Sequence, residues 1–239
     1  LSGVGFITTY RMIPPFMEIF LKKRIFGVDI NKVEDIKNLN DPNRKEVPET
    51  LGLVPALVFL IVAILYQTTS ILNQAEALKF SSTLISICFM GFLGFVDDMV
   101  DLRWRYKLVL PTVASIPIVL AYSSDKDLII PNILIKILSL VNLNNIVLIG
   151  FVYKIYISLL SVFCTNAINI YAGINGLEVG QSLVIAISMV LYNLIEVSNN
   201  TTDVNGNLNN NLASLSILIF FIAVTVPLFI YNKYPSKCF

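Results

Sequence analysis

The stretch Phe80–Asp98, FSSTLISICFMGFLGFVDD, decides how this chain folds. It carries no charge before its last two residues, and Phe80–Val96 is long enough to cross most of a bilayer as one helix. Asp97 and Asp98 then place two carboxylates at the mouth of that helix. Such a pair is costly unless it is solvated, paired with cations or bound to a metal. The stretch therefore predicts a membrane helix with a polar site at its end.

Similar uncharged runs occur along the rest of the chain. The sequence is 56% hydrophobic and only 14% charged, whereas soluble domains carry about 25% charged residues. A buried helix in a soluble core would account for one such run but not for six. We therefore predict an all-α, polytopic membrane helix bundle of about seven transmembrane helices, the first interrupted by Arg11 and Pro14-Pro15: Leu1 to about Phe26, Leu51–Tyr66, Phe80–Val96, Leu108–Tyr122, Ile155–Ile174, Val179–Ile195 and Leu212–Tyr231.

Basic residues gather in alternate loops. The loops after the first and third predicted helices are rich in Lys and Arg, whereas the loop between the sixth and seventh has neither. The positive-inside rule assigns the basic loops to the cytosol. Parity then places three polar loops on that one face, and we expect them to form a site: Asp29–Glu49, Asp97–Lys107 and Tyr171–Glu178.

Composition limits the chemistry of such a site. The chain has no histidine, which excludes histidine acid–base catalysis and disfavours a zinc site. A metal would need oxygen ligands, which indicates Mg²⁺, with Mn²⁺ as the alternative. The three cysteines form no disulfide framework, and the net charge of +1 argues against a nucleic-acid partner.

Three carboxylates are spaced for one end of a helix. Asp101 follows Asp97 at i+4 and Asp98 at i+3, so the three share neighbouring faces. Their mutual repulsion would be relieved by a divalent cation or by Lys107 and its neighbouring arginines. The alternative is a solvated helix end whose charges lie in the headgroup layer.

A second polar segment, Thr165–Glu178 (TNAINIYAGINGLE), begins inside an apolar run. Asn166 and Asn169 share a helix face at i, i+3, and an amide offers both a metal-ligand oxygen and a donor for phosphate. Gly173 and Gly176 allow the backbone to approach a ligand. The alternative is hydrogen bonding between helices. Carboxylates, amides and a lysine, without histidine or an activated nucleophile, suit phosphoryl transfer.

These residues resemble a known family. Leu93–Asp98 (LGFVDD) and Leu102–Pro111 (LRWRYKLVLP) are similar to the aspartate-rich motif of polyprenyl-phosphate sugar-1-phosphate transferases. Phe163–Ile170 (FCTNAINI) and Ala172–Glu178 (AGINGLE) resemble the second signature of the eukaryotic branch, where bacterial relatives tend to have an Asp-Gly-based loop. Pro48-Glu49 and Tyr231–Ser236 (YNKYPS) fit the same branch.

The resemblance implies transfer of N-acetylglucosamine-1-phosphate from UDP-N-acetylglucosamine to dolichyl phosphate. It implies a multi-pass protein of the endoplasmic reticulum bilayer whose active site faces the cytosol. Asp97, Asp98 and Lys107 would be catalytic, and Asn169 would bind magnesium. The resemblance also implies substrate-binding residues. The nucleotide sugar would be bound by Val28, Asp29, Ile30, Glu49 and Asn175, and the lipid phosphate by Asn166 within the segment 162–170. Two further substrate-binding residues are Glu178 and Asp101, the second of which relatives can replace by Asn.

Family comparison also predicts what surrounds this sequence. We expect residues 1–239 to be a single integral membrane transferase domain truncated at both ends. A Gly-Asp motif that completes the family's magnesium site, and a later basic loop, would follow Phe239, so the fragment alone is expected to be inactive. A transporter or channel with an acidic ion site, and a transferase for another UDP-sugar, are the alternatives. Oligomeric state stays open at this point, with a homodimer among the alternatives.

Overall fold

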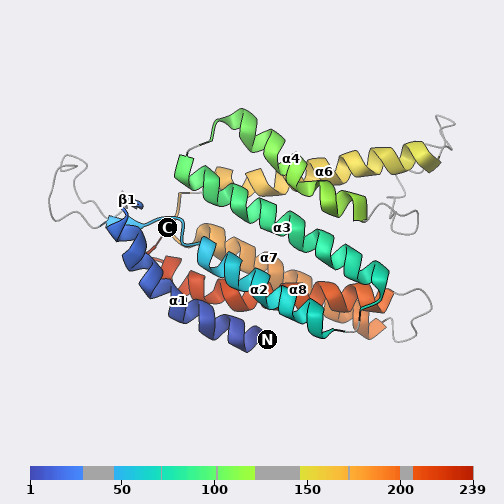
Figure 1. Ribbon diagram of the computed structural model, residues 1–239, viewed down its shortest axis with the longest axis horizontal. Coiled ribbons are helices and arrows are strands. Elements are labelled where there is room, and N and C mark those ends of the chain that lie inside the picture. The colour runs from blue at the N-terminus through green and yellow to red at the C-terminus, as the bar shows by residue number, and fades with distance from the viewer. Residues whose placement is uncertain are drawn as a thin grey trace. The chain divides into compact units, whose positions relative to one another are not determined.

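A computed structural model describes residues 1–28, 46–70, 72–100, 102–121, 146–171, 173–199 and 207–238 (Figure 1). This described part contains seven helices and one two-stranded antiparallel ribbon. The predicted helical architecture is therefore confirmed, whereas the ribbon was not predicted. The chain divides into two compact units.

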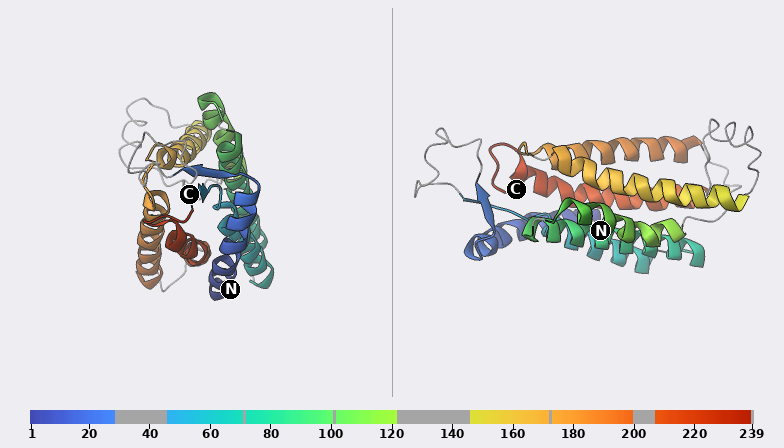
Figure 2. Two further views of the ribbon diagram at one scale, coloured as in Figure 1. Left: turned by 90° about the vertical axis from the view of Figure 1, so that its left-hand side faces the viewer. Right: turned by 90° about the horizontal axis from the view of Figure 1, so that it is seen from above.

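Unit 1 combines residues 1–71, 94–101 and 171–239. Helix α8 packs against three others, α1, α2 and α7. Figure 2 shows α7 and α8 lying side by side along their length. The elements that lie wholly within unit 1 are α1 (Ser2–Lys22), β1 (Phe26–Val28), β2 (Glu46–Pro48), α2 (Leu53–Thr69), α7 (Leu177–Asn199) and α8 (Asn207–Asn232).

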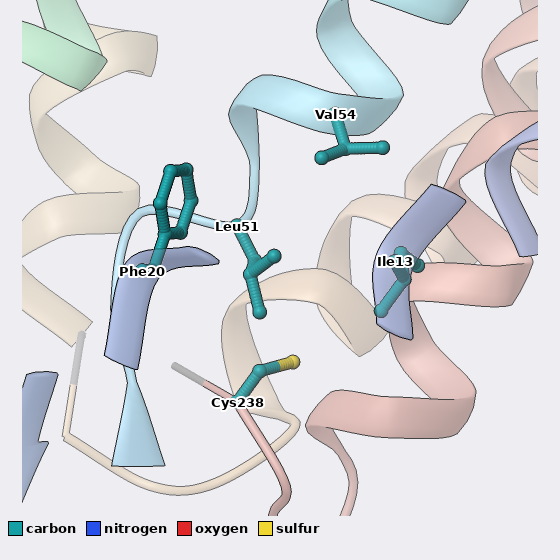
Figure 3. Packing of buried hydrophobic residues seen from close by; sticks show 5 residues of the cluster. All are labelled: Ile13, Phe20, Leu51, Val54 and Cys238. Atoms are coloured by element: carbon teal, nitrogen blue, oxygen red, sulfur yellow. The ribbon is translucent and has the colours of Figure 1, made fainter. Parts of the chain in front are cut away.

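A cluster of buried apolar side chains joins both ends of the sequence of unit 1. It draws on α1, the turn before α2, the first residues of α2 and the chain that follows α8 (Figure 3): Ile13, Phe20, Leu51, Val54 and Cys238. Removing an aliphatic side chain of this size from water contributes about 1.5–3 kcal/mol. The amide of Asn232 donates a hydrogen bond of 3.0 Å to the carbonyl of Cys238, so the chain turns back into the cluster as soon as α8 ends.

Polar side chains in unit 1 are paired between helices. The hydroxyl of Ser216 on α8 donates to the hydroxyl of Tyr66 on α2 at 3.0 Å. The amide of Asn193 on α7 donates to the hydroxyl of Ser214 on α8, also at 3.0 Å. Polar groups in a lipid environment need partners within the protein. Within the described ranges, every buried side-chain nitrogen or oxygen has a hydrogen-bond partner.

Unit 2 combines residues 72–93 and 102–170. It contains most of α3 (Gln74–Val100) together with α4 (Trp104–Ala121) and α6 (Ile146–Tyr171). A capping box begins α3: the carboxamide oxygen of Asn73 accepts the Glu76 N–H at 2.9 Å, and the Glu76 carboxylate accepts the Asn73 N–H at 3.1 Å. These bonds satisfy backbone donors that a helix start leaves without an intrahelical partner.

Short hydroxyl side chains hold the three helices of unit 2 together. The hydroxyls of Ser115 on α4 and Ser158 on α6 lie 3.2 Å apart. The N–H of Ile118 on α4 donates to the hydroxyl of Ser86 on α3, also at 3.2 Å. Small polar residues allow close backbone approach between membrane helices, and their hydrogen bonds add specificity.

Four helical segments are long and apolar enough to cross a bilayer, so in the described residues the predicted count of seven spans is not supported: Gln74–Val100, Gly150–Ile168, Leu177–Ser198 and Asn211–Asn232. Helix α2 has 17 residues and is therefore about 25 Å long, short of a hydrocarbon core of about 30 Å. In α1, the charged residues Arg11 and Glu18 interrupt the apolar run. In α4, Arg105 and Lys107 lie in the first turn, so the apolar part of that helix is shorter than the helix itself. Uncharged runs therefore predicted these helices but overestimated how many span.

Candidate active site

The acidic pair lies at the C-terminal end of α3. Asp97 is half-buried and Asp98 is exposed, and both belong to the segment of α3 that is part of unit 1. The C-terminal end of a helix carries a partial negative charge, so carboxylates there cost stability unless a cation compensates them. The position of the pair is therefore unfavourable for folding alone and favours a role in binding cations or positioning a substrate.

The carboxylates of this pair are also candidate ligands for the predicted magnesium ion. No group of three carboxylate, thiol or imidazole side chains that could hold an ion occurs among the residues that the structure describes. Amide oxygens are a further kind of donor that a magnesium ion can use beside carboxylates. The amide of Asn169, a residue within α6, is a hard neutral oxygen donor of the type that Mg²⁺ accepts. Carboxylate and amide oxygens fit the ion chemically.

The ribbon places Glu49 beside Gly27. Strands β1 and β2 pair in antiparallel register, with Gly27 opposite Val47, and the Glu49 N–H donates to the Ile25 carbonyl at 3.4 Å. The Glu49 side chain then lies across Gly27: a methyl group added there would lie 2.9 Å from Glu49 Cδ and still closer to its carboxylate oxygen Oε1. Only glycine leaves room for the carboxylate in this position.

Thr50 fixes the turn that follows Glu49. It is buried and has a φ of 62°, in the left-handed region where a β-branched residue is strained. Its hydroxyl donates to the Glu49 carbonyl at 2.7 Å, and its carbonyl accepts the Leu53 N–H at 3.2 Å as α2 begins. Strain of this kind persists only where the surrounding structure determines it, and it clusters at functional sites.

The glycine-containing loop before α7 is set against the end of α8. Gly173 and Gly176 have φ values of 140° and 84°, which side chains rarely adopt. A methyl group at Gly176 would lie 3.1 Å from Lys233 Cα, whereas nothing lies within 4 Å of one at Gly173. Asn175 is half-buried between them, and Glu178 is exposed in the first turn of α7. The glycines thus determine where Asn175 and Glu178 sit on unit 1.

Lys107 and Asn166 meet within unit 2. Lys107 is half-buried in the first turn of α4, and Asn166 is buried near the end of α6. The Asn166 amide donates to the Lys107 carbonyl at 3.0 Å and to the Val162 carbonyl at 2.9 Å. Asn169 lies three residues farther along α6, as its spacing predicted.

The predicted site residues are therefore distributed over both units. Unit 1 contains Asp97, Asp98, Glu49, Asn175 and Glu178, and unit 2 contains Lys107, Asn166 and Asn169. Val28 ends β1, pairing with Glu46, whereas Asp29, Ile30 and Asp101 lie outside the described residues.

Sequence reasoning did not single out Gly27 or Thr50, which hold Glu49, or Lys233, which faces Gly176. The sequence does show that Gly27 directly precedes Val28–Ile30, which were predicted to bind the nucleotide sugar. No signal in the sequence marks Thr50, because β-branched residues normally avoid positive φ.

The described helices, four of which are long and apolar enough to cross a bilayer, are those of a multi-pass membrane protein. The chain belongs to glycosyl transferase family 4, which it matches over residues 80–239. This match covers the acidic pair, the Lys107 segment and the second polar loop, which the resemblance also used.

Curated relatives match nearly the whole sequence. A protein of Dictyostelium discoideum named UDP-N-acetylglucosamine–dolichyl-phosphate N-acetylglucosaminephosphotransferase is 40% identical over 249 residues, which cover 99% of this chain and 60% of that protein. Proteins of the same name from Schizosaccharomyces pombe and Saccharomyces cerevisiae are 34% and 29% identical, and the matches cover 100% and 98% of this chain. The matches span 56% of each yeast protein, so the chain spans little more than half the length of these relatives.

Proposed function

We propose that the full-length protein transfers N-acetylglucosamine-1-phosphate from UDP-N-acetylglucosamine to dolichyl phosphate, giving dolichyl-diphosphate N-acetylglucosamine and UMP. The observation that carries this proposal is the 40% identity, over 99% of the chain, to a relative named for this transfer. Family membership supports the reaction class. The carboxylates, amides and lysine of the candidate site support it chemically, because phosphoryl transfer needs positioned charges more than covalent catalysis.

In the proposed reaction, an oxygen of the lipid phosphate attacks the phosphorus that carries the sugar. The bond from that phosphorus to the bridging oxygen breaks, and UMP leaves with the electron pair. The lipid phosphate is already anionic near neutral pH, so Asp97 and Asp98 mainly orient it rather than serve as strong bases. Lys107 binds the lipid phosphate in this proposal, and its ammonium offsets repulsion between the two anionic substrates.

The nucleotide sugar would be held by unit 1. Glu49, placed by Gly27 and Thr50, is available for a hydrogen bond to a hydroxyl or N–H of the donor, and Asn175 offers both donor and acceptor groups. Glu178, Asp101 and the backbone of residues 28–30 are proposed to complete this side of the site. Asn166 was expected to contact the lipid phosphate.

Magnesium is the proposed cofactor, with manganese as the alternative. Asn169 would hold the ion together with carboxylate oxygen. When bound, the ion neutralises charge on the diphosphate. We further propose that residues 1–239 belong to one integral membrane transferase domain of the endoplasmic reticulum membrane and that its site faces the cytosol. The Lys- and Arg-rich loops after the first and third predicted helices support this orientation.

A direct transfer assay tests the proposal. Full-length protein in membranes would be given labelled UDP-N-acetylglucosamine and dolichyl phosphate, and the lipid-soluble product and UMP would be measured. We expect both to form, and Asp98→Asn to lower kcat by about 100-fold or more, within the range of acid–base and orienting groups. Glu76→Gln is the matched control, because Glu76 caps the other end of α3.

Two outcomes would contradict the proposal. Product formation from UDP-N-acetylgalactosamine at the same kcat/KM would refute the sugar assignment. Absence of transfer from any UDP-sugar, with the protein folded and embedded in membranes, would refute the reaction class and return attention to ion transport.

A further inference from the structure

Helix α4 contains a proline four residues after Lys107. In an α-helix the carbonyl of residue 107 accepts a hydrogen bond from the N–H of residue 111. Residue 111 is Pro111, which has no N–H to donate. Pro111 is fully buried, so its ring is part of the packing of α4. The helical turn that carries Lys107 therefore needs a donor from elsewhere.

Asn166 on α6 provides that donor. Its amide nitrogen lies 3.0 Å from the Lys107 carbonyl oxygen and 2.9 Å from the Val162 carbonyl oxygen one turn back on its own helix. Both partners are acceptors, so the NH₂ group of the amide must face them. Both of its N–H groups are thereby engaged with backbone, and the side chain is buried. This amide bridges α6 to the first turn of α4.

The bridge matters because a helix start is otherwise weakly held. The first turn of α4 begins with bonds of 2.9 Å from the Tyr106 N–H and 3.4 Å from the Lys107 N–H to the Arg103 carbonyl. The second bond is long, and first-turn residues have few intrahelical bonds. The lysine side chain is flexible, so the place of its ammonium depends on how firmly its backbone is fixed.

We propose that Asn166 is a positioning residue that acts through Lys107, and that Pro111 creates the need for it. Asn166 then fixes the backbone from which Lys107 reaches the lipid phosphate, instead of contacting that phosphate itself. The inference rests on the proposed function, in which Lys107 binds the phosphate of the acceptor.

A double-mutant cycle in the full-length protein separates this role from direct contact. Asn166→Ala should lower kcat/KM for dolichyl phosphate by about fivefold to tenfold, the loss expected for one buried hydrogen bond. KM for UDP-N-acetylglucosamine should stay unchanged. Pro111→Ala restores a backbone N–H at residue 111 and should have activity near that of the natural protein. In the Pro111→Ala background, Asn166→Ala should cost less than about twofold, because the helix then supplies its own donor.

A second cycle uses Lys107→Ala and does not depend on the folding of the Pro111 variant. If Asn166 acts through Lys107, Asn166→Ala should lower kcat/KM for dolichyl phosphate little further once the lysine side chain is gone. Thermal unfolding in detergent would establish that each variant is folded.

An equal loss from Asn166→Ala in all three backgrounds would overturn the inference and indicate direct contact with substrate. Inactivity of the unmutated protein with dolichyl phosphate would instead refute the proposed function, so the two failures are distinguishable.

Discussion

The side chain of Glu49 lies directly over Gly27, so close that a methyl group on Gly27 would lie 2.9 Å from Glu49 Cδ. Gly27 needs no unusual backbone angle for this, because it pairs with Val47 in an ordinary antiparallel ribbon. The glycine is therefore required by the carboxylate above it. This contact links a residue that has no chemistry of its own to one that we propose binds the nucleotide sugar.

Substituting Gly27 should displace Glu49 without altering the backbone. We expect Gly27→Ala to raise KM for UDP-N-acetylglucosamine by about tenfold or more, since a shift of about 1 Å in a positioning group can cost up to 100-fold. Steady-state kinetics on full-length protein would measure it.

Gly52→Ala is the matched control for that change. Gly52 has a φ of −54° at the start of α2, and nothing lies within 4 Å of a methyl group there. Its kinetics should match those of the natural protein. The idea fails if Gly27→Ala raises KM equally in a Glu49→Ala background, where no carboxylate remains to be displaced.

A pair of glycines tests the loop before α7. Gly173→Ala and Gly176→Ala both place a side chain at positive φ, which costs about 1–3 kcal/mol. Only Gly176→Ala also presses on Lys233, whose Cα would lie 3.1 Å from the new methyl group. We expect the thermal unfolding midpoint to fall for both variants, and further for Gly176→Ala by the equivalent of about 1–3 kcal/mol of overpacking. Equal unfolding midpoints for the two variants would contradict this prediction and show that the backbone at Lys233 shifts to make room for the added methyl group.

Magnesium dependence should respond to Asn169. We expect Asn169→Ala to raise the Mg²⁺ concentration for half-maximal transfer by about tenfold or more, as loss of one ligand removes a strong oxygen donor. Asn193→Ala is the control, because Asn193 is another helical asparagine but its amide bonds to Ser214 in α7–α8 packing. Titration of activity with Mg²⁺ measures both. An unchanged requirement in the Asn169 variant would remove Asn169 from the metal site.

The buried thiol of Cys238 predicts that the free energy of unfolding depends on pH. Burial raises the pKa of Cys238 to about 12 from an ordinary value of 9.0. Between these values the unfolded chain releases the proton and the folded chain keeps it. The unfolded state then binds fewer protons, so this thiol lowers the free energy of unfolding as pH rises through that window.

Alkylation at about pH 9 would show whether the folded protein keeps this thiol protonated and buried, because iodoacetamide reacts with the thiolate. Mass spectrometry of the Cys238 peptide should show slow modification in the folded protein and fast modification after denaturation. Equal rates in the two states would show that the tail after α8 does not stay in the cluster.

The helices were predictable because long apolar runs leave few other folds. Phe80–Val96 lies inside α3, and Leu212–Tyr231 lies inside α8. The positions of Asn166 and Asn169 on one helix were also correct. The number of spans was overestimated because the apolar runs in α1 and α4 are interrupted or flanked by charge, and α2 is short.

The supporting contacts of the site were not predictable for a different reason. Strands of three residues are too short to show an alternating pattern, so β1 and β2 left no signal. The contact between Glu49 and Gly27 depends on their pairing. The sequence shows that Pro111 lies four residues after Lys107, but it does not show which group donates to the Lys107 carbonyl. That donor, Asn166, lies 59 residues from Lys107 in the sequence. Only the folded arrangement brings the two together.

The central place of α8 in unit 1 has a consequence for synthesis. Helices α1 and α2 emerge from the ribosome before the other described helices, yet α8, which packs on both of them, emerges after all the others described. All of unit 2 is made in between. Early helices must therefore wait in the membrane with their α8-facing surfaces uncovered, and such delayed long-range pairing slows assembly and invites wrong partners. Substitutions that weaken the α1–α8 contact should thus reduce the yield of inserted protein more than the activity of each molecule that folds.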